Sequence, residues 1–157
     1  MKKRYYIAYG SNLNMEQMAL RCPPAAIRGT AELKGWELLF QGSKTGAYLT
    51  IEERNGGSVP VVIWEVTESD VVALDRYEGL PSLYYKKKLR LQYKDLRTGG
   101  RRMVNAFAYI MYETRPIGIP SAFYMRPCLE GYAAFFFDRK VLAAAYDKCR
   151  EAVENEG

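Results

Sequence analysis

Histidine is absent from the 157 residues of this sequence. Its absence excludes Ser-His-Asp and Cys-His nucleophilic sites, histidine-based zinc hydrolysis and the imidazole group that most enzymes use for proton transfer. Any general base in this chain must therefore be a carboxylate, a lysine, a tyrosine or a thiolate.

Cysteine and long apolar runs are scarce as well. The three cysteines, Cys22, Cys128 and Cys149, form no Cys-x-x-Cys pair, so we expect reduced packing residues rather than zinc ligands or disulfides. No run of about eighteen uncharged apolar residues occurs, and the run after the basic start ends at Gly10, too early for a signal peptide. We therefore expect a soluble cytoplasmic protein that does not enter a membrane.

The remaining composition is that of one globular domain covering residues 1–157, with 48% hydrophobic and 26% charged residues. The net charge is +5, from 23 basic and 18 acidic residues. The main basic clusters, Lys86–Lys88 and Arg101–Arg102, lie beside or within strand-like sequence, where a solvated sheet edge explains them. We therefore predict no nucleic-acid partner; a small anionic substrate would also suit this charge.

The N-terminal stretch Tyr5–Asn14 has the pattern of a binding turn. Tyr5–Tyr9 combines aromatic and β-branched residues, which predicts a central strand buried on both faces. Gly10-Ser11-Asn12 then predicts a tight turn, because glycine permits close backbone approach and serine and asparagine favour turns. Asn14 is suited to cap a helix from Met15 to about Leu20. Backbone N–H groups would converge here and suit a carboxylate or an oxyanion.

The middle of the chain is expected to be mostly strand. Asn55-Gly56-Gly57 predicts a hairpin turn, and a second polar turn around Asp95–Gly100 predicts another hairpin. With the N-terminal strand, the segments give about six or seven strands in a curved or barrel-like, mostly antiparallel sheet. The predicted strands cover Ile27–Leu33, Trp36–Phe40, Ala47–Glu53, Val59–Val66, Leu83–Tyr93 and Met103–Tyr112.

Helical patterns are interspersed with these strands and dominate the C-terminal part. Thr67–Glu78 has a capping pattern at its start and Gly79 as a stop. Ser121–Arg126 reads as a helix kinked at Pro127, and Asp138–Glu154 carries one apolar stripe that core packing explains. The predicted fold is therefore α+β: a small mixed, mostly antiparallel β-barrel with surrounding helices.

Glu78 is the acidic residue that the helical pattern sets apart. Val71, Leu74 and Glu78 are spaced i, i+3 and i+7, so the carboxylate projects from the apolar face. It also lies at the negative end of the helix dipole. Both effects would raise the pKa and make Glu78 a better proton acceptor near neutral pH. The alternative is a frayed last turn in which Glu78 faces water.

Three motifs occur in order along most of the chain. Tyr9-Gly10-Ser11-Asn12-Leu13 follows an N-terminal strand, Glu78-Gly79 ends a helix, and Pro120-Ser121-x-x-Tyr124 lies near the C-terminus. Together they resemble the γ-glutamylcyclotransferase-like family. The resemblance implies a small mixed barrel with surrounding helices, in agreement with the strand and helix pattern.

The resemblance also implies roles for particular residues. Glu78 would be the acid-base residue, and Tyr124 together with either Tyr84 or Tyr85 would line the pocket, with Tyr85 as our candidate. Pro127 departs from a smooth helix after the Pro-Ser segment, which affects the local pocket shape. The γ-glutamyl group would be held by the first motif, that is, by Tyr9, Gly10, Ser11, Asn12 and Leu13.

The implied reaction releases 5-oxoproline and a free amine from a small γ-glutamyl substrate and needs no metal or cofactor. The leaving group lies outside the motif residues, so an amino acid, an amine, a lysine side chain and a biosynthetic intermediate all stay open. The alternative is a non-catalytic module that binds a metabolite or nucleic acid. The apolar segment Tyr132–Phe137 would suit a homodimer surface, although core burial explains it more simply.

Overall fold

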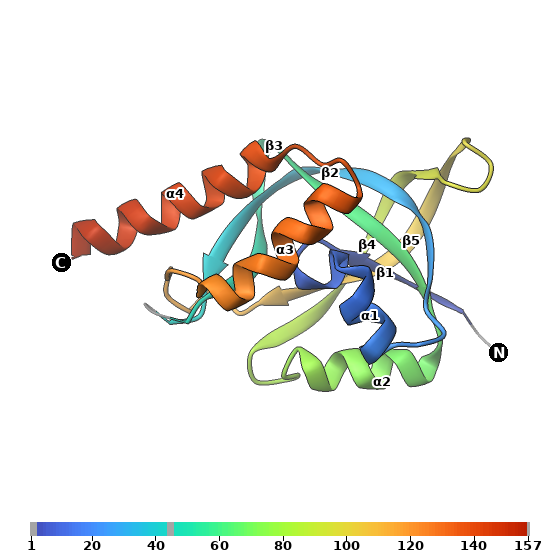
Figure 1. The fold of residues 1–157 in the computed structure, drawn as a ribbon, viewed down its shortest axis with the longest axis horizontal. Coiled ribbons are helices and arrows are strands. Elements are labelled where there is room, and N and C mark those ends of the chain that lie inside the picture. Colours follow the sequence, from blue (N-terminus) through green and yellow to red (C-terminus); the bar gives the residue numbers. More distant parts are fainter. Residues whose placement is uncertain (1–2, 44–45, 157) are drawn as a thin grey trace.

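The computed structural model describes residues 3–43 and 46–156, and in this part of the chain five strands close into a barrel (Figure 1). The strand order around the barrel is β1-β3-β2-β4-β5. Neighbouring strands are antiparallel except β1 and β5, which run parallel. The predicted α+β, mixed and mostly antiparallel barrel is confirmed. The strands are β1 (Arg4–Ala8), β2 (Ala26–Gln41), β3 (Tyr48–Val66), β4 (Tyr84–Asp95) and β5 (Arg101–Met111).

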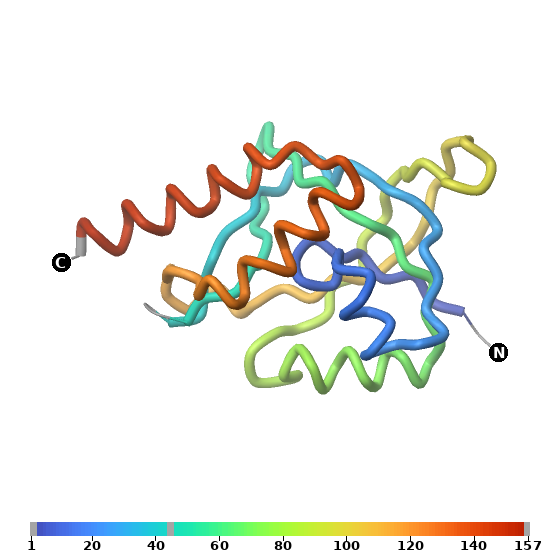
Figure 2. Tube along the Cα trace, viewed as in Figure 1, coloured from blue at the N-terminus to red at the C-terminus, as the bar shows by residue number. Residues whose placement is uncertain are grey.

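Helices cover the barrel on several sides. Figure 1 shows α2 and α3 on different sides of the turn that follows β1, and α4 reaching beyond the barrel. The trace in Figure 2 shows this turn beside α1 and α3, and both helices contact it. The helices in the described residues are η1 (Ser11–Leu13, a 3-10 turn), α1 (Met15–Arg21), α2 (Glu68–Tyr77), α3 (Ala122–Ala134) and α4 (Arg139–Glu156).

The strand number is five rather than six or seven, because four of the predicted segments join into the long strands β2 and β3. The predicted hairpin at Asn55-Gly56-Gly57 is wrong, since the residues on both sides of it pair with β2 in one direction. The register shifts here: Lys34 pairs with Ser58, whereas Trp36 pairs with Glu53. The glycines therefore form a bulge in a continuous strand, which bends the sheet without reversing the chain.

The helix boundaries follow the capping residues of the sequence. The Asn14 side chain accepts a hydrogen bond from the Gln17 N–H at 3.0 Å and starts α1. Thr67 and Asp70 form a reciprocal capping box at the start of α2. At the other end, Gly79 has a φ of 70°, a conformation that favours glycine and turns the chain away from the helix.

Helix α3 continues through Pro127 to Ala134 instead of ending there. Its contact with the turn after β1 is close, because a Cβ added at Gly131 would lie only 2.5 Å from the Leu13 Cβ. In the apolar segment Tyr132–Phe137, which begins at the end of α3, Tyr132 is buried whereas Phe136 is 94% exposed. The segment thus divides between core and surface, and the homodimer stays a prediction.

The core fills the barrel and the space beneath α3 and α4. All three cysteines are buried and free, as expected. The apolar stripe of α4 packs inward through Leu142 and Cys149. None of the helices in the described residues has the length and apolar character that crossing a membrane requires.

Candidate active site

A cavity of about 260 Å³ opens between the turn after β1 and the end of α2. Glu78 is its only acidic or basic lining residue apart from tyrosines. Any charge on a bound ligand would therefore meet tyrosine hydroxyls, backbone dipoles and one carboxylate. The lining residues are Tyr6, Tyr9, Gly10, Ser11, Asn12, Tyr48, Tyr77, Glu78, Leu83, Tyr84, Tyr109 and Tyr124.

The predicted turn Gly10-Ser11-Asn12 is present and forms one wall of the cavity, and its binding of an anion stays a prediction. Gly10 precedes the 3-10 turn η1, and no side chain of the described residues caps this turn. The first N–H groups of a helical turn lack partners within the turn, so they are available to a ligand. Gly10 also keeps the wall open, because a Cβ there would lie 3.3 Å from the Tyr124 hydroxyl.

Glu78 forms the facing wall at the end of α2. Val71 and Leu74 of the same helix are buried, and the half-buried Glu78 side chain lines the cavity on that side. No hydrogen bond from the described residues reaches its carboxylate. Burial raises the pKa of Glu78 to about 7, and the positive charge of Arg21 partly opposes this rise. Of the two orientations expected for Glu78, the structure has the one on the apolar side of the helix, and Glu78 does not lie in a frayed last turn that faces water.

Tyr84, and not Tyr85, belongs to the cavity. The Tyr84 hydroxyl donates to the Leu49 carbonyl at 2.8 Å, while the Tyr124 hydroxyl accepts from the Leu49 N–H at 3.0 Å. Both tyrosines are thereby fixed to the same residue of β3. Tyr85 points to the opposite side of β4 and donates to the Glu113 carboxylate at 2.6 Å. The choice of Tyr85 was wrong, because neighbouring strand residues face opposite sides of a sheet.

Leu13 does not line the cavity either. Its side chain is fully buried and packs beneath Gly131 of α3, so it anchors the turn instead of touching a ligand. The other motif residues, Tyr9, Gly10, Ser11, Asn12 and Tyr124, do meet at the cavity with Glu78. Their roles in binding stay a prediction.

Four further tyrosines at the cavity, Tyr6, Tyr48, Tyr77 and Tyr109, were missed by sequence reasoning. Thirteen tyrosines in the chain are the one signal that could have drawn attention to them. Two of the four come from β1 and β5, the parallel pair, whose contact the sequence pattern does not predict.

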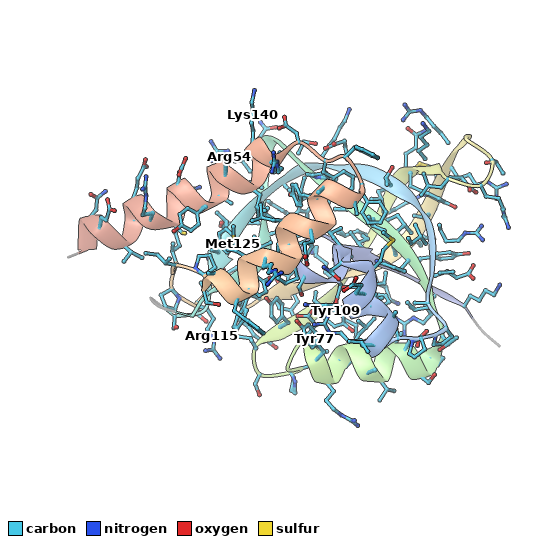
Figure 3. The ribbon with its side chains drawn as sticks, in the orientation of Figure 1. Arg54, Tyr77, Tyr109, Arg115, Met125 and Lys140 are labelled. Carbon is cyan, nitrogen blue, oxygen red and sulfur yellow. The ribbon has the colours of Figure 1, made fainter. Side chains whose placement is uncertain are left out.

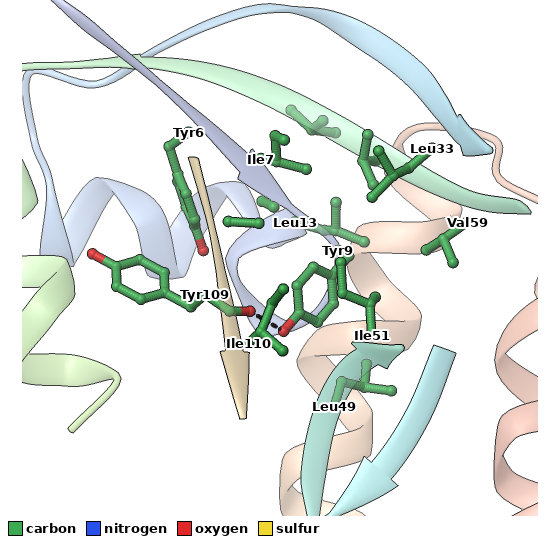
Figure 4. Close-up of a cluster of buried hydrophobic side chains, with 14 of the residues drawn as sticks. Tyr6, Ile7, Tyr9, Leu13, Leu33, Leu49, Ile51, Val59, Tyr109 and Ile110 are labelled. Atoms are coloured by element: carbon green, nitrogen blue, oxygen red, sulfur yellow. Dashed lines mark hydrogen bonds between the residues drawn. The ribbon is translucent and has the colours of Figure 1, made fainter. Parts of the chain in front are cut away.

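Hydrogen bonds to other protein groups fix the hydroxyls of Tyr9 and Tyr109 at the cavity. Tyr9 donates to the backbone carbonyl of Tyr109, as drawn in Figure 4, and Tyr109 donates to Asp75 at 2.6 Å. Lys86 also contacts Asp75, at 3.1 Å. Figure 3 shows Tyr77 and Tyr109 near each other beside α2.

Burial raises the pKa of five of the cavity tyrosines above their ordinary value, which keeps them neutral. This holds for Tyr6, Tyr9, Tyr84 and Tyr124, and the pKa of Tyr109 is raised in the same direction. Neutral hydroxyls can hydrogen-bond a ligand but cannot act as bases. Glu78 is therefore the one lining side chain that can accept a proton near neutral pH.

The barrel with its surrounding helices is a fold seen in solved structures. A structure named "Gamma-glutamyl cyclotransferase" superposes with a TM-score of 0.72 and 27% identity, covering 85% of this chain and 80% of that one. YkqA from Bacillus subtilis shares the fold with a TM-score of 0.68 and 18% identity, over 98% of this chain and 55% of that one. Residues 6–126 match the family model described as "Gamma-glutamyl cyclotransferase, AIG2-like". The chain belongs to this family.

Two mammalian relatives match part of the chain. The human protein named "Gamma-glutamylcyclotransferase" is 39% identical over 87 residues, and the bovine protein of the same name is 38% identical over 87 residues. Each match covers 51% of this chain and 46% of the relative. The chain thus spans about half the length of the relatives it matches.

Proposed function

We propose that this protein converts a γ-glutamyl amino acid or amine into 5-oxoproline and the free amine. The observation that carries the proposal is the Glu78 carboxylate, which faces the Gly10-Ser11-Asn12 turn across the cavity without a hydrogen-bond partner among the described residues. A half-buried carboxylate without such a partner is unfavourable for folding, and its presence in a cavity favours a role in proton transfer. Family membership and the names of the relatives support the same chemistry.

In the first step, Glu78 accepts a proton from the α-amino group of the substrate. The freed amine attacks its own γ-carbonyl carbon, and a new C–N bond closes the five-membered ring. Because the nucleophile belongs to the substrate, the protein needs only to hold a folded conformer, and intramolecular attack has a large proximity advantage. A pKa of about 7 suits Glu78 to this task, since a base is most effective when its pKa lies near the working pH.

In the second step, the bond between the γ-carbon and the departing nitrogen breaks. Glu78 returns its proton to that nitrogen, the carbonyl re-forms, and the amine leaves in neutral form, so the carboxylate is restored. The ring nitrogen, which still carries two hydrogens after the attack, releases one as a proton to solvent, and the neutral lactam results. N–H groups of the Gly10-Ser11-Asn12 turn stabilise the negative charge that develops on the carbonyl oxygen between the two steps. One carboxylate thus serves as base and then as acid, which suits a chain without histidine.

The proposal is tested with γ-glutamyl amino acids, γ-glutamyl amines, γ-glutamyl-lysine and glutathione, each assayed for release of 5-oxoproline. Glu78→Gln is the control, because it keeps the shape of the side chain and removes the base. We expect turnover of at least one substrate by the wild type and loss of about 10²–10⁴-fold in the variant. Binding of a γ-glutamyl compound without any 5-oxoproline would instead identify a non-catalytic module.

A further inference from the structure

Arg21, the last residue of α1, lies behind the cavity wall and contacts two residues that line the cavity, Asn12 and Tyr77. Its guanidinium donates to the Asn12 side-chain oxygen at 2.5 Å and to the Gln17 side-chain oxygen at 2.6 Å. It also lies over the Tyr77 ring, 3.6 Å from the ring centre. Arg21 does not line the cavity, so it acts on a ligand through the residues that it contacts and through its charge, which partly opposes the rise in the pKa of Glu78.

The contact with Arg21 fixes the orientation of the Asn12 amide. A guanidinium has only donors, so the amide must turn its oxygen toward Arg21 and its nitrogen the other way. On that other side the amide nitrogen lies 2.9 Å from the Tyr6 hydroxyl. An amide nitrogen can only donate, and the hydroxyl oxygen of Tyr6 is therefore the acceptor.

The Tyr6 hydroxyl keeps its single proton for another partner. Its ring is only 4% exposed and packs 5.7 Å from the Tyr109 ring, yet the residue lines the cavity. Figure 4 shows the Tyr6 ring reaching from β1 toward the hydroxyl-bearing rings of Tyr9 and Tyr109. Within the described part of the chain, Asn12 is the sole hydrogen-bond partner of this hydroxyl. The remaining direction for its proton is the cavity.

We propose that Arg21 is a positioning residue that, by orienting Asn12, commits the Tyr6 hydroxyl to donate a hydrogen bond to an oxygen of the bound substrate. This inference rests on the proposed function and adds to it a donor that the Tyr-Gly-Ser-Asn motif does not contain. It also changes the role of Asn12, whose amide oxygen and nitrogen both have partners within the protein. The Asn12 side chain acts through Tyr6, while its backbone N–H stays part of the turn that faces the substrate.

Arg21 also contacts Tyr77, which lies at the end of α2 on the Glu78 side of the cavity. Tyr77, under the guanidinium, places its hydroxyl 3.2 Å from the Ser11 hydroxyl, so the end of α2 is linked to the turn after β1. The position of the Tyr6 hydroxyl relative to Glu78 therefore depends on the Arg21 guanidinium. Lysine would keep the charge and the donor-only character, whereas glutamine could present either its oxygen or its nitrogen to Asn12.

The test is a double-mutant cycle on kcat for the best γ-glutamyl substrate, with Tyr6→Phe and Asn12→Asp. An aspartate would still accept from Arg21 but would also accept the Tyr6 proton and so remove it from the cavity. We expect each single change to lower kcat about 10²-fold, as loss of one oxyanion donor does. The double variant should lose little more than either single one, because both remove the same hydrogen bond.

Two variant sets separate positioning from loss of fold. Tyr132→Phe is the matched tyrosine control, since this buried hydroxyl has no partner among the described residues and lies outside the cavity; kcat should not change. Arg21→Lys should retain more kcat than Arg21→Gln at equal thermal stability. If the wild type is active and the loss of kcat in the double variant equals the product of the two single losses, the link between Asn12 and Tyr6 is overturned and the proposed function stays intact. An inactive wild type would overturn both.

Discussion

Glu78 and Asp95 lie near opposite ends of β4, and the pKa values of their carboxyl groups are shifted in opposite directions. Glu78 precedes the strand and has no hydrogen-bond partner among the described residues, and burial raises its pKa to about 7. Asp95 ends the strand and is fully covered in the folded chain, yet its pKa is lowered. Shielding from water alone does not decide the ionisation of a carboxyl group.

The difference lies in the hydrogen-bond donors around each group. One oxygen of Asp95 accepts from the N–H groups of Arg97 at 2.8 Å and Thr98 at 3.4 Å, and these bonds, that of Arg97 first, lower the pKa. Its other oxygen faces the Arg102 guanidinium at 3.7 Å. Asp95 thus holds the β4–β5 turn as a charged group. No such donor among the described residues stabilises the charged form of Glu78, so its carboxylate is free to accept a proton from a ligand.

Exchanging each carboxylate for its amide gives the largest expected contrast. Glu78→Gln should lower 5-oxoproline release about 10²–10⁴-fold, because the base is lost. Asp95→Asn should leave release close to wild type at temperatures where it is folded and should lower the unfolding temperature, because an amide is a weaker acceptor for the two N–H groups. The comparison fails if both variants lose turnover equally, or if Asp95→Asn alone does.

The pH dependence of stability should also differ in sign at the two ends. The folded state binds the Glu78 proton more tightly than the unfolded chain does, so its contribution falls as pH rises from 4.5 to about 7. Glu78→Gln should therefore be more stable than wild type by about 1 to 3 kcal/mol at pH 8, and by nothing at pH 4. Asp95 has a lowered folded pKa, so its contribution is present above the unfolded pKa and is lost as pH falls.

Urea unfolding at several pH values measures these differences. Asp95→Asn should lose its stability deficit as the solution is made acidic, opposite to the trend for Glu78→Gln. Parallel curves for wild type and Glu78→Gln across pH 4 to 8 would mean that Glu78 has an ordinary pKa.

Two glycines sharpen the comparison with a smaller effect on activity. Gly29 pairs with Asp95, and a Cβ there would lie 2.0 Å from the Lys94 carbonyl oxygen. A Cβ added at Gly10 would lie 3.3 Å from the Tyr124 hydroxyl, a much milder contact. Gly29→Ala should therefore cost about 1 to 3 kcal/mol or more of stability, whereas Gly10→Ala should keep stability and raise KM a few-fold. Thermal unfolding and steady-state kinetics check both; an unchanged KM for Gly10→Ala would show that the turn does not approach the substrate.

Much of the Glu78 end could be predicted from the sequence, because its signals are local. Gly10 and Asn14 mark a turn and a helix start, and Thr67, Asp70 and Gly79 mark the two ends of α2. A helix with fixed ends fixes which face each residue occupies, so the spacing placed Glu78 on the apolar face, with a frayed last turn as the alternative that the cavity geometry then decided against.

The parts that could not be predicted depend on strand register and on contacts between separate elements of the fold. Asn55-Gly56-Gly57 has the local chemistry of a hairpin, but the continued pairing of β3 with β2 turns it into a bulge. Tyr84 and Tyr85 are adjacent in sequence, and only the register of β4 against β5 decides which one faces the cavity. Leu13 is drawn into the core by Gly131, more than a hundred residues later.

The ionisation of Glu78 can be measured directly in the wild-type protein. Glutamate labelled with ¹³C at the side-chain carboxyl is followed by NMR across pH, and the Glu78 signal is assigned by its loss in Glu78→Gln. A midpoint near 7 is the predicted result. A midpoint near the ordinary 4.5 would contradict the claim that this end of the barrel holds its carboxylate ready to accept a proton.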